Sequence, residues 1–420
     1  MHDTALAARR DAAGPDELIR LKSEYLIPCV FHFYKDPPQI VAGHACTLVD
    51  HAGREYLDCF SGVTVVNAGH CNPEIIEPAI EQLRTLQHTT SIYLTEPVLR
   101  LAEKLASIAP GDLRRSFFCA SGSEAVEGSL LLAALHTSRP EIVAFKGGLH
   151  GRTRLAMNVT GLDMWRTDPF PLPGIHHARY GDFEDVRRIV DERDGRIGAI
   201  IAEPIQGNAG INVPPPDFWP RVRELCDHRG IALIFDEVQT GFNRTGRRFA
   251  CQHWGVTPDI MVVSKALGNG FPIAAFITTD AIAAAYRRPG ASTYGGNPVC
   301  AAAALASIEF HENARLADRA RERGEQLRAH LINLARRCPD TFLPPRGMGL
   351  MLGLPVVDTR GSPSPGRCDA MLEALKSRGM LVGKTGAERN VLTFMPPLVI
   401  TPDEITRLGQ AISDSKSDIG

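Results

Sequence analysis

Short apolar runs alternate with helical patterns through the middle of the chain. The runs are rich in β-branched residues and bounded by Gly, Pro or Asp, which is typical of buried strands; they cover residues 141–145, 197–202, 231–235, 260–263 and 273–278. Between two of them, residues 217–228 place apolar side chains at helical spacing. This alternation predicts an α/β fold in which helices cover both faces of a mostly parallel sheet. Ligands in such sheets bind at the carboxyl ends of the strands.

The two chain ends predict a second, smaller α+β domain. Residues 316–334 form an amphipathic pattern, and residues 48–58 form a hairpin pattern with a turn at 50–53. The chain has 420 residues, more than the roughly 250–300 at which a single core usually stops growing. We therefore expect residues 1–65 and 316–420 to build the small domain and residues 66–315 to form the large one. Residues 347–355 and 379–383 also suggest this smaller α+β domain, and a surface loop is expected at 361–366.

The composition of the chain argues against several classes of binding partner. A formal net charge of -2 argues against nucleic acid or an anionic membrane surface, and no apolar run approaches the roughly 20 residues that span a bilayer. Residues 1–4 show no secretory signal, and acidic residues soon after 5–10 disfavour a transit peptide. The ten cysteines are scattered without a C-x-x-C pair, so no metal site and a cytoplasmic location are expected.

Residues 121–125 are a candidate phosphate site. They follow the short apolar segment 116–119 and open a helix that is expected to run to about His136. The free N–H groups of Gly122 and Ser123, together with the helix dipole, suit an anion. The alternative is a plain serine N-cap with an early acid at Glu124.

A candidate acid and a candidate lysine each follow an apolar strand. Asp236 stands at the end of residues 231–235, where a buried carboxylate needs a partner such as a pyridinium N–H. Helix capping or magnesium binding are its alternatives. Lys265 follows residues 260–263 and precedes a glycine-rich turn, where apolar surroundings favour a lowered pKa and imine chemistry. The alternative is an ordinary surface lysine.

The order and spacing of these three signals resemble the class III (ω-)aminotransferases, which have fold type I of the pyridoxal 5'-phosphate (PLP) enzymes. The resemblance covers residues 25–408. It lies in the motifs at 148–153, 202–207, 236–241, 264–266, 292–298 and 396–400. Residues 60–63 and 69–73 look most like the alanine–glyoxylate and β-alanine–pyruvate branch.

The resemblance implies PLP as the cofactor and assigns the groups that would hold it. Lys265 would be the Schiff-base lysine and proton carrier, and Asp236 would pair with the pyridine nitrogen. Gln239 would contact the ring hydroxyl, while Gly122 and Ser123 would hold the phosphate.

Four further positions belong to the implied cofactor site. Glu203 would support the region around Gln239, and His150 lies in the same motif as Leu149, which stands where an aromatic residue usually stacks on the ring. Thr293 would reach the phosphate of the other subunit. The resemblance therefore implies a homodimer with a shared active site.

The implied reaction moves an amino group from an amino acid or ω-amine to a small oxo acid through pyridoxamine phosphate. Asn208 and Thr393 stand where many members carry a Glu–Arg pair that clamps carboxylates. Because both partners are replaced together, no buried charge is stranded, and we expect pyruvate or glyoxylate to be better acceptors than 2-oxoglutarate. Arg389 is a nearby candidate for binding the carboxylate; otherwise it is a solvated loop residue.

Two other classes of function remain open. Racemases, decarboxylases and lyases share the same cofactor residues, and a non-catalytic PLP-binding module is disfavoured because Lys265 and Asp236 are both present. Among the remaining polar residues, the pair at 176–177 is expected to pack in a loop rather than bind metal. His70 is expected to be structural and Arg244 to hold a loop.

Overall fold

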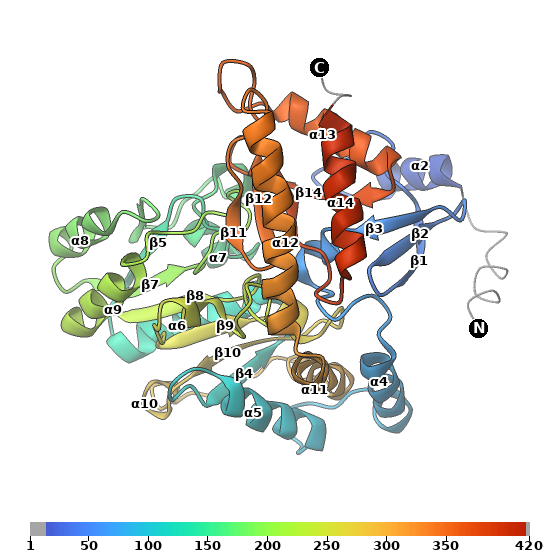
Figure 1. The fold of residues 1–420 in the computed structure, drawn as a ribbon. Helices are drawn as coiled ribbons and strands as arrows, with labels where there is room; N and C mark the ends of the chain where they lie inside the picture. The colour runs from blue at the N-terminus through green and yellow to red at the C-terminus, as the bar shows by residue number, and fades with distance from the viewer. Residues whose placement is uncertain (1–13, 417–420) are drawn as a thin grey trace.

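A computed structural model describes residues 14–416, and its centre is a seven-stranded sheet. Strand β10 runs antiparallel to both of its neighbours, and the remaining strand pairs are parallel. The expected α/β fold with a mostly parallel sheet is confirmed (Figure 1). In spatial order the strands are β4 (Arg115–Cys119), β10 (Ala274–Thr278), β9 (Ile260–Val263), β8 (Ala232–Asp236), β7 (Ile197–Ala202), β5 (Glu141–Phe145) and β6 (Ile175–Ala178).

Both faces of this sheet are buried, which explains why its strands read as continuous apolar runs. Alternate residues of one strand enter different cores, as with Ile200 and Ile201 of β7. One core includes side chains of α6 (Gly122–Thr137) and α7 (Arg154–Val159). The other includes side chains of α5 (Glu96–Ile108), α8 (Phe183–Glu192), α9 (Phe218–Arg229) and α11 (Pro298–Asn313).

The two chain ends meet in one four-stranded sheet. It consists of β1 (Ile40–His44), β2 (Thr47–Asp50), β3 (Glu55–Asp58) and β13 (Met380–Leu381), with β3 and β13 parallel. The expected hairpin is confirmed: the Asp50 carboxylate accepts hydrogen bonds from the N–H groups of Ala52 and Arg54 across the turn. In Figure 1 the blue strands accordingly lie beside the orange and red C-terminal elements.

A second four-stranded sheet comes entirely from the C-terminal part of the chain. Its order is β11 (Arg346–Met348), β12 (Met351–Pro355), β15 (Val391–Phe394) and β14 (Gly383–Thr385). The long amphipathic helix expected from residue 316 is confirmed as α12 (Leu316–Arg337), and it shares a core with α13 (Pro365–Ser377) and α14 (Pro402–Ser415). The remaining α-helices are α2 (Pro15–Tyr25), α3 (Ser61–Thr64), α4 (Pro73–Thr85) and α10 (Asp280–Ala283).

Two local predictions were wrong. His176 and His177 lie in the edge strand β6 rather than a loop, and His176 Nε2 lies 2.8 Å from Glu141 Oε2. Strand β6 was missed because its residues are polar and show no strand pattern. Its strand conformation comes from pairing with β5. The loop at 361–366 is shorter than expected, because Pro365 already occupies the first turn of α13, where a proline is tolerated.

Two features of the sequence bear on location: the first ten residues and the length of the apolar runs. Residues 1–4 and 5–10, considered above for targeting signals, lie outside the described residues. Within residues 14–416, no helix has both the length and the apolar character needed to cross a bilayer.

Candidate active site

The carboxyl ends of adjacent strands β7, β8 and β9 bring the predicted residues to one cavity of about 210 Å³. Every predicted site residue except Thr293 lines it. The lining residues are Gly122, Ser123, Leu149, His150, Gly151, Glu203, Asp236, Val238, Gln239, Ser264 and Lys265. The position agrees with the rule that open α/β sheets bind ligands at this edge.

One wall of the cavity is the first turn of α6. The Ser121 side chain caps the helix by accepting a hydrogen bond from Glu124 N, so the N-cap alternative describes a real contact. The cap uses the Glu124 N–H and leaves those of Gly122 and Ser123 available for an anion. Gly151 packs so closely on this turn that an added Cβ would lie 2.5 Å from Ser123 Oγ. A small residue is therefore required there.

A buried carboxylate and a buried imidazole form the polar floor of the cavity. Asp236 Oδ2 lies 2.8 Å from His150 Nδ1, and Asp236 Oδ1 accepts a hydrogen bond from Val238 N. Both side chains are almost fully buried. His150 Nε2 has no hydrogen-bond partner within the described residues. The pair therefore offers a negative charge held in a fixed orientation at the end of β8.

Glu203 connects this floor to the surrounding loops. Its two carboxylate oxygens accept hydrogen bonds from Leu149 N and Gly207 N, each at 2.9 Å. Burial raises the pKa of Glu203 to about 7, against the opposing effect of His150. An added Cβ on Gly207 would lie 2.3 Å from Gln239 Oε1, so this glycine lets Gln239 approach.

Lys265 is separated from β9 by Ser264 alone and begins a short 3₁₀ turn, Lys265–Leu267. Its φ of 48° lies in the left-handed region, where a non-glycine residue is strained. Burial lowers the pKa of its amine to about 8, although Asp236 and Glu203 oppose the shift. A larger share of the amine is then unprotonated near neutral pH, as nucleophilic and proton-transfer chemistry requires.

A second cavity of about 380 Å³ adjoins the first, and Leu149 and Lys265 line both. Most of the residues that line it are apolar. Lys384 and Arg389 are two further cations in its lining. The other lining residues are Phe31, Phe33, Phe60, Gly62, Val63, Met164, Trp165, Asn208, Thr385 and Gly386.

Sequence reasoning missed Trp165, Lys384 and Thr385 in this second cavity. They come from segments far apart in the chain, and no local spacing marks them. Thr393 is fully buried, with its hydroxyl 2.6 Å from that of Thr385. Thr293 is exposed and lines neither cavity of this single chain.

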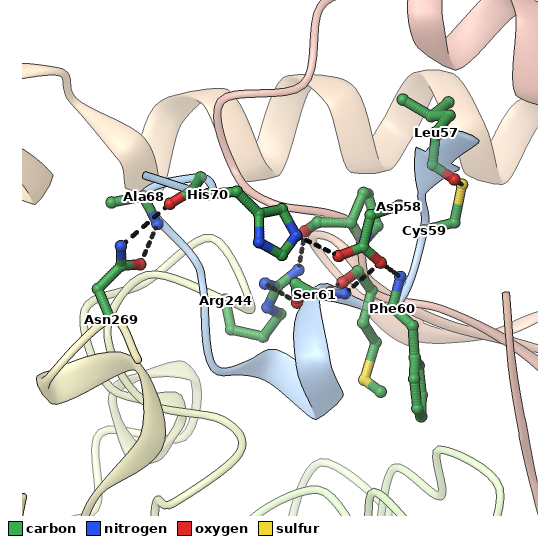
Figure 2. Close-up of polar contacts among 12 residues, drawn as sticks. Leu57, Asp58, Cys59, Phe60, Ser61, Ala68, His70, Arg244 and Asn269 are labelled. Atoms are coloured by element: carbon green, nitrogen blue, oxygen red, sulfur yellow. Dashed lines mark hydrogen bonds and ion pairs between the residues drawn. The ribbon is translucent and has the colours of Figure 1, made fainter. Parts of the chain in front are cut away.

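Arg244 and Asp58 hold the loop that forms one wall of the second cavity (Figure 2). Asp58 accepts hydrogen bonds from the N–H groups of Phe60 and Ser61, and its other oxygen lies 2.7 Å from His70 Nε2. His70 thus has a structural contact, as expected. Residues 61–64 all have positive φ, so the loop is strained and needs such support.

Arg244 is fully buried and ties both ends of this loop. Its guanidinium donates to Ser61 Oγ and Asn67 Oδ1, and also to the carbonyl oxygens of Leu350 and Pro396. Burial lowers its pKa to about 9. The expected loop-holding function of Arg244 matches these contacts.

Replacing Arg244 with methionine is expected to destabilise the protein and to raise KM. The change leaves buried acceptors on Leu350, Pro396 and Asn67 unpaired, at roughly 1–3 kcal/mol each. Urea unfolding and steady-state kinetics measure the two effects. The exposed neighbour Arg247, changed to methionine, is the matched control. Equal stability of the two variants would contradict this account.

The first cavity fits the PLP that the resemblance implies. A helix N-terminus suits a phosphate, a buried carboxylate suits a pyridinium N–H, and a lysine of lowered pKa suits an aldehyde. His150 Nε2, in the floor of the same cavity, is a polar atom without a hydrogen-bond partner among the described residues. Magnesium at Asp236 has less support, because residues 14–416 contain no cluster of three His, Cys, Asp or Glu side chains that could hold a metal ion.

Comparison with known proteins agrees with the resemblance over most of the chain. Residues 35–415 match the family described as aminotransferase class-III. The chain is 36% identical to an alanine–glyoxylate aminotransferase 2 homologue of Arabidopsis thaliana, over 96% of this chain and 88% of that protein. It is 38% identical to an acetylornithine aminotransferase of Methanosarcina acetivorans, over 93% and 94%.

The fold comparison extends to a structure with cofactor. An amine transaminase from an uncultivated Pseudomonas species, in its PLP-bound form, superposes with a TM-score of 0.86 at 30% identity, covering 92% of this chain and 96% of that one. The predicted resemblance is therefore confirmed. The chain belongs to the class III aminotransferases and is a PLP-dependent enzyme.

Proposed function

We propose that this enzyme moves an amino group from an amino acid or ω-amine to a small oxo acid such as pyruvate or glyoxylate. One observation carries the proposal. The Lys265 amine, whose pKa is lowered, lines both a polar cavity that fits the cofactor and an apolar cavity that fits a substrate. A proton carrier must reach both groups in this way.

The chain's own residues divide the work around the cofactor. Bound PLP supplies an aldehyde that condenses with amines and a ring that withdraws electrons from the substrate carbon. Lys265 Nζ would take a proton from that carbon and pass it to a second carbon atom. The Asp236 carboxylate, oriented by His150, would keep the ring nitrogen protonated, and Gln239 would bond the ring hydroxyl.

The remaining contacts fix the position of the cofactor. The N–H groups of Gly122 and Ser123 would bind the phosphate at the start of α6. Leu149 would pack on the ring face without an aromatic quadrupole. Its backbone N–H donates a hydrogen bond to Glu203, which fixes the position of this residue.

We also infer a homodimer whose active sites are shared. Thr293 and Tyr294 are exposed on a loop near other exposed apolar side chains; His88 contacts the Tyr294 ring. In the same region Ile92 is 81% exposed and Leu94 is 88% exposed. Exposed apolar patches of this kind mark protein interfaces, and Thr293 would then reach the partner's phosphate site.

A cytoplasmic location is proposed as well. All ten cysteines are free, and most of them are buried. Such thiols are typical of proteins in a reducing compartment.

Pyruvate and glyoxylate are expected to give kcat/KM values at least about tenfold above that of 2-oxoglutarate, equivalent to ~1.4 kcal/mol. A dicarboxylate such as 2-oxoglutarate would need a free cation for each of its two carboxylates. Among the described residues around the substrate cavity, Lys384 is already paired with Asp369, and Thr393 is uncharged. Steady-state rates with each acceptor and one common donor measure this preference; comparable values would overturn it.

The half-reaction tests the proposed function itself. Purified holoenzyme is mixed with β-alanine, L-alanine, 4-aminobutyrate or a simple amine, without acceptor, while the visible absorbance of the bound cofactor is followed. Loss of the visible band, reversed by pyruvate or glyoxylate, supports transamination. If the band persists while an amino acid is racemised, decarboxylated or cleaved, one of the alternative PLP reactions is correct.

A further inference from the structure

The second, largely apolar cavity, here called the substrate cavity, contains a guanidinium that no carboxylate of residues 14–416 neutralises. Arg389 lines the cavity, and its Cζ lies 5.3 Å from the Phe31 ring centroid and 5.9 Å from that of Phe33. Contacts of this length are cation–π interactions, which hold a cation in place without cancelling its charge. Within residues 14–416 no acidic side chain forms an ion pair with Arg389.

The other cations of this cavity are already engaged. Lys384 is nearly buried and forms an ion pair with Asp369. Lys265 carries the proton-transfer function proposed above. Arg389 is therefore the charge left free for a ligand, and the adjacent acid, Glu388, is exposed and does not line the cavity.

A tight backbone turn holds Arg389 beside the cavity. Arg389 has a φ of 52°, in the left-handed region, and its N–H donates to the Gly386 carbonyl in a tight turn. The Gly386 N–H in turn donates to the carbonyl of Asn208, which lines the same cavity. Strained residues of this kind persist where surrounding contacts enforce them, and they cluster at ligand sites.

We infer that Arg389 binds the carboxylate of the amino donor, so that the donor is an amino acid rather than a simple amine or a diamine. This inference rests on the proposed function. A planar guanidinium forms two parallel hydrogen bonds with a carboxylate. The aromatic rings of Phe31, Phe33 and Phe60 line the space that the donor's carbon chain occupies. A second ammonium group would be repelled by Arg389 and finds no unpaired acid among the described residues of the cavity.

The kinetic test uses three donors of equal chain length with pyruvate as acceptor: 4-aminobutyrate, butylamine and 1,4-diaminobutane. The wild-type holoenzyme is expected to prefer 4-aminobutyrate. In Arg389→Met the KM for 4-aminobutyrate rises roughly tenfold to a hundredfold, while kcat/KM for butylamine changes by less than about threefold. Methionine still packs on the phenylalanine rings, and Glu388→Gln is the control for the loop.

A binding test separates this inference from the proposed function. Valerate is an unreactive carboxylate and valeramide its neutral isostere; stabilisation of the holoenzyme against heat reports binding of either. We expect valerate alone to raise the melting temperature of the wild type, and Arg389→Met to abolish that rise while melting normally without ligand. Valerate binding without any transamination would refute the proposed function and keep the carboxylate site.

Three results would overturn the inference. The first is an equal loss of rate for 4-aminobutyrate and butylamine in Arg389→Met. The second is valerate stabilisation that survives in this variant. The third is a loss of valerate binding in Lys384→Met but not in Arg389→Met, which would assign the carboxylate to Lys384.

Discussion

Replacing Lys265 with alanine is expected to lower kcat by at least about a thousandfold, the upper part of the range for a positioned proton carrier. The residue has two proposed functions, covalent attachment of the cofactor and transfer of the proton. No other amine is placed to replace it, because Lys384, the other lysine lining the substrate cavity, is paired with Asp369. Single-turnover rates with 4-aminobutyrate and with L-alanine measure the loss.

A charge-preserving variant and a rescue experiment distinguish chemistry from packing. Lys265→Arg keeps a cation in place, but a guanidinium remains protonated and cannot act as the base. We therefore expect it to be as inactive as the alanine variant. Ethylamine added to Lys265→Ala should restore part of the rate, because a small amine fits the space left by the side chain. Activity in the arginine variant would refute the assignment.

The Lys265→Ala variant is also expected to change stability, which is measured on the protein without cofactor. Burial lowers the pKa of Lys265 to about 8 in the folded protein, below the ordinary lysine value of 10.5. The cost of burying its charge is therefore fully present below pH 8 and is relieved as the pH rises toward 10.5. Lys265→Ala removes this cost, so its gain in stability over the wild type should be largest below pH 8 and shrink above it.

The sequence predicted the polar cavity well because its residues are placed by strand ends. Asp236 ends the buried strand β8, Lys265 lies just beyond the buried strand β9, and adjacent parallel strands end at the same edge of a sheet. The phosphate site likewise follows β4 and opens α6. Local pattern and global topology agree at these three points, so spacing along the chain was enough to bring them together.

The substrate cavity was only partly predictable, because its walls depend on contacts between distant segments. Phe33 and Arg389 come from loops and Trp165 from a short 3₁₀ turn, and the positions of these segments are set by packing rather than by any repeat. Arg244 illustrates the same limit: the sequence suggested that it holds a loop but not which one. Its partners Ser61 and Pro396 lie 183 and 152 residues away.

Changing Asp236 to asparagine is expected to lower kcat/KM by a factor on the order of 10² to 10³, the typical loss when one preorganised electrostatic group is removed from an active site. The amide oxygen can still accept the hydrogen bond from Val238 N, and the amide NH2 then faces His150 Nδ1, which can accept from it in its other ring tautomer, so the geometry of the floor is retained. What is lost is the negative charge that keeps the ring nitrogen of the cofactor protonated. The half-reaction with pre-bound PLP isolates this effect from weaker cofactor binding.

The matched control for Asp236 is the neighbouring acid Glu237. Its carboxylate is also fully buried, but it accepts hydrogen bonds from Thr240, Ala250 N and Cys251 N and does not line the cavity. Glu237→Gln should therefore reduce stability to urea while altering the visible spectrum of the bound cofactor little. Asp236→Asn should do the opposite, changing the pH dependence of that spectrum with a small effect on unfolding. If both variants changed stability and spectrum alike, burial of an acid rather than contact with the ring nitrogen would explain the data, and Asp236 would lose its assigned role.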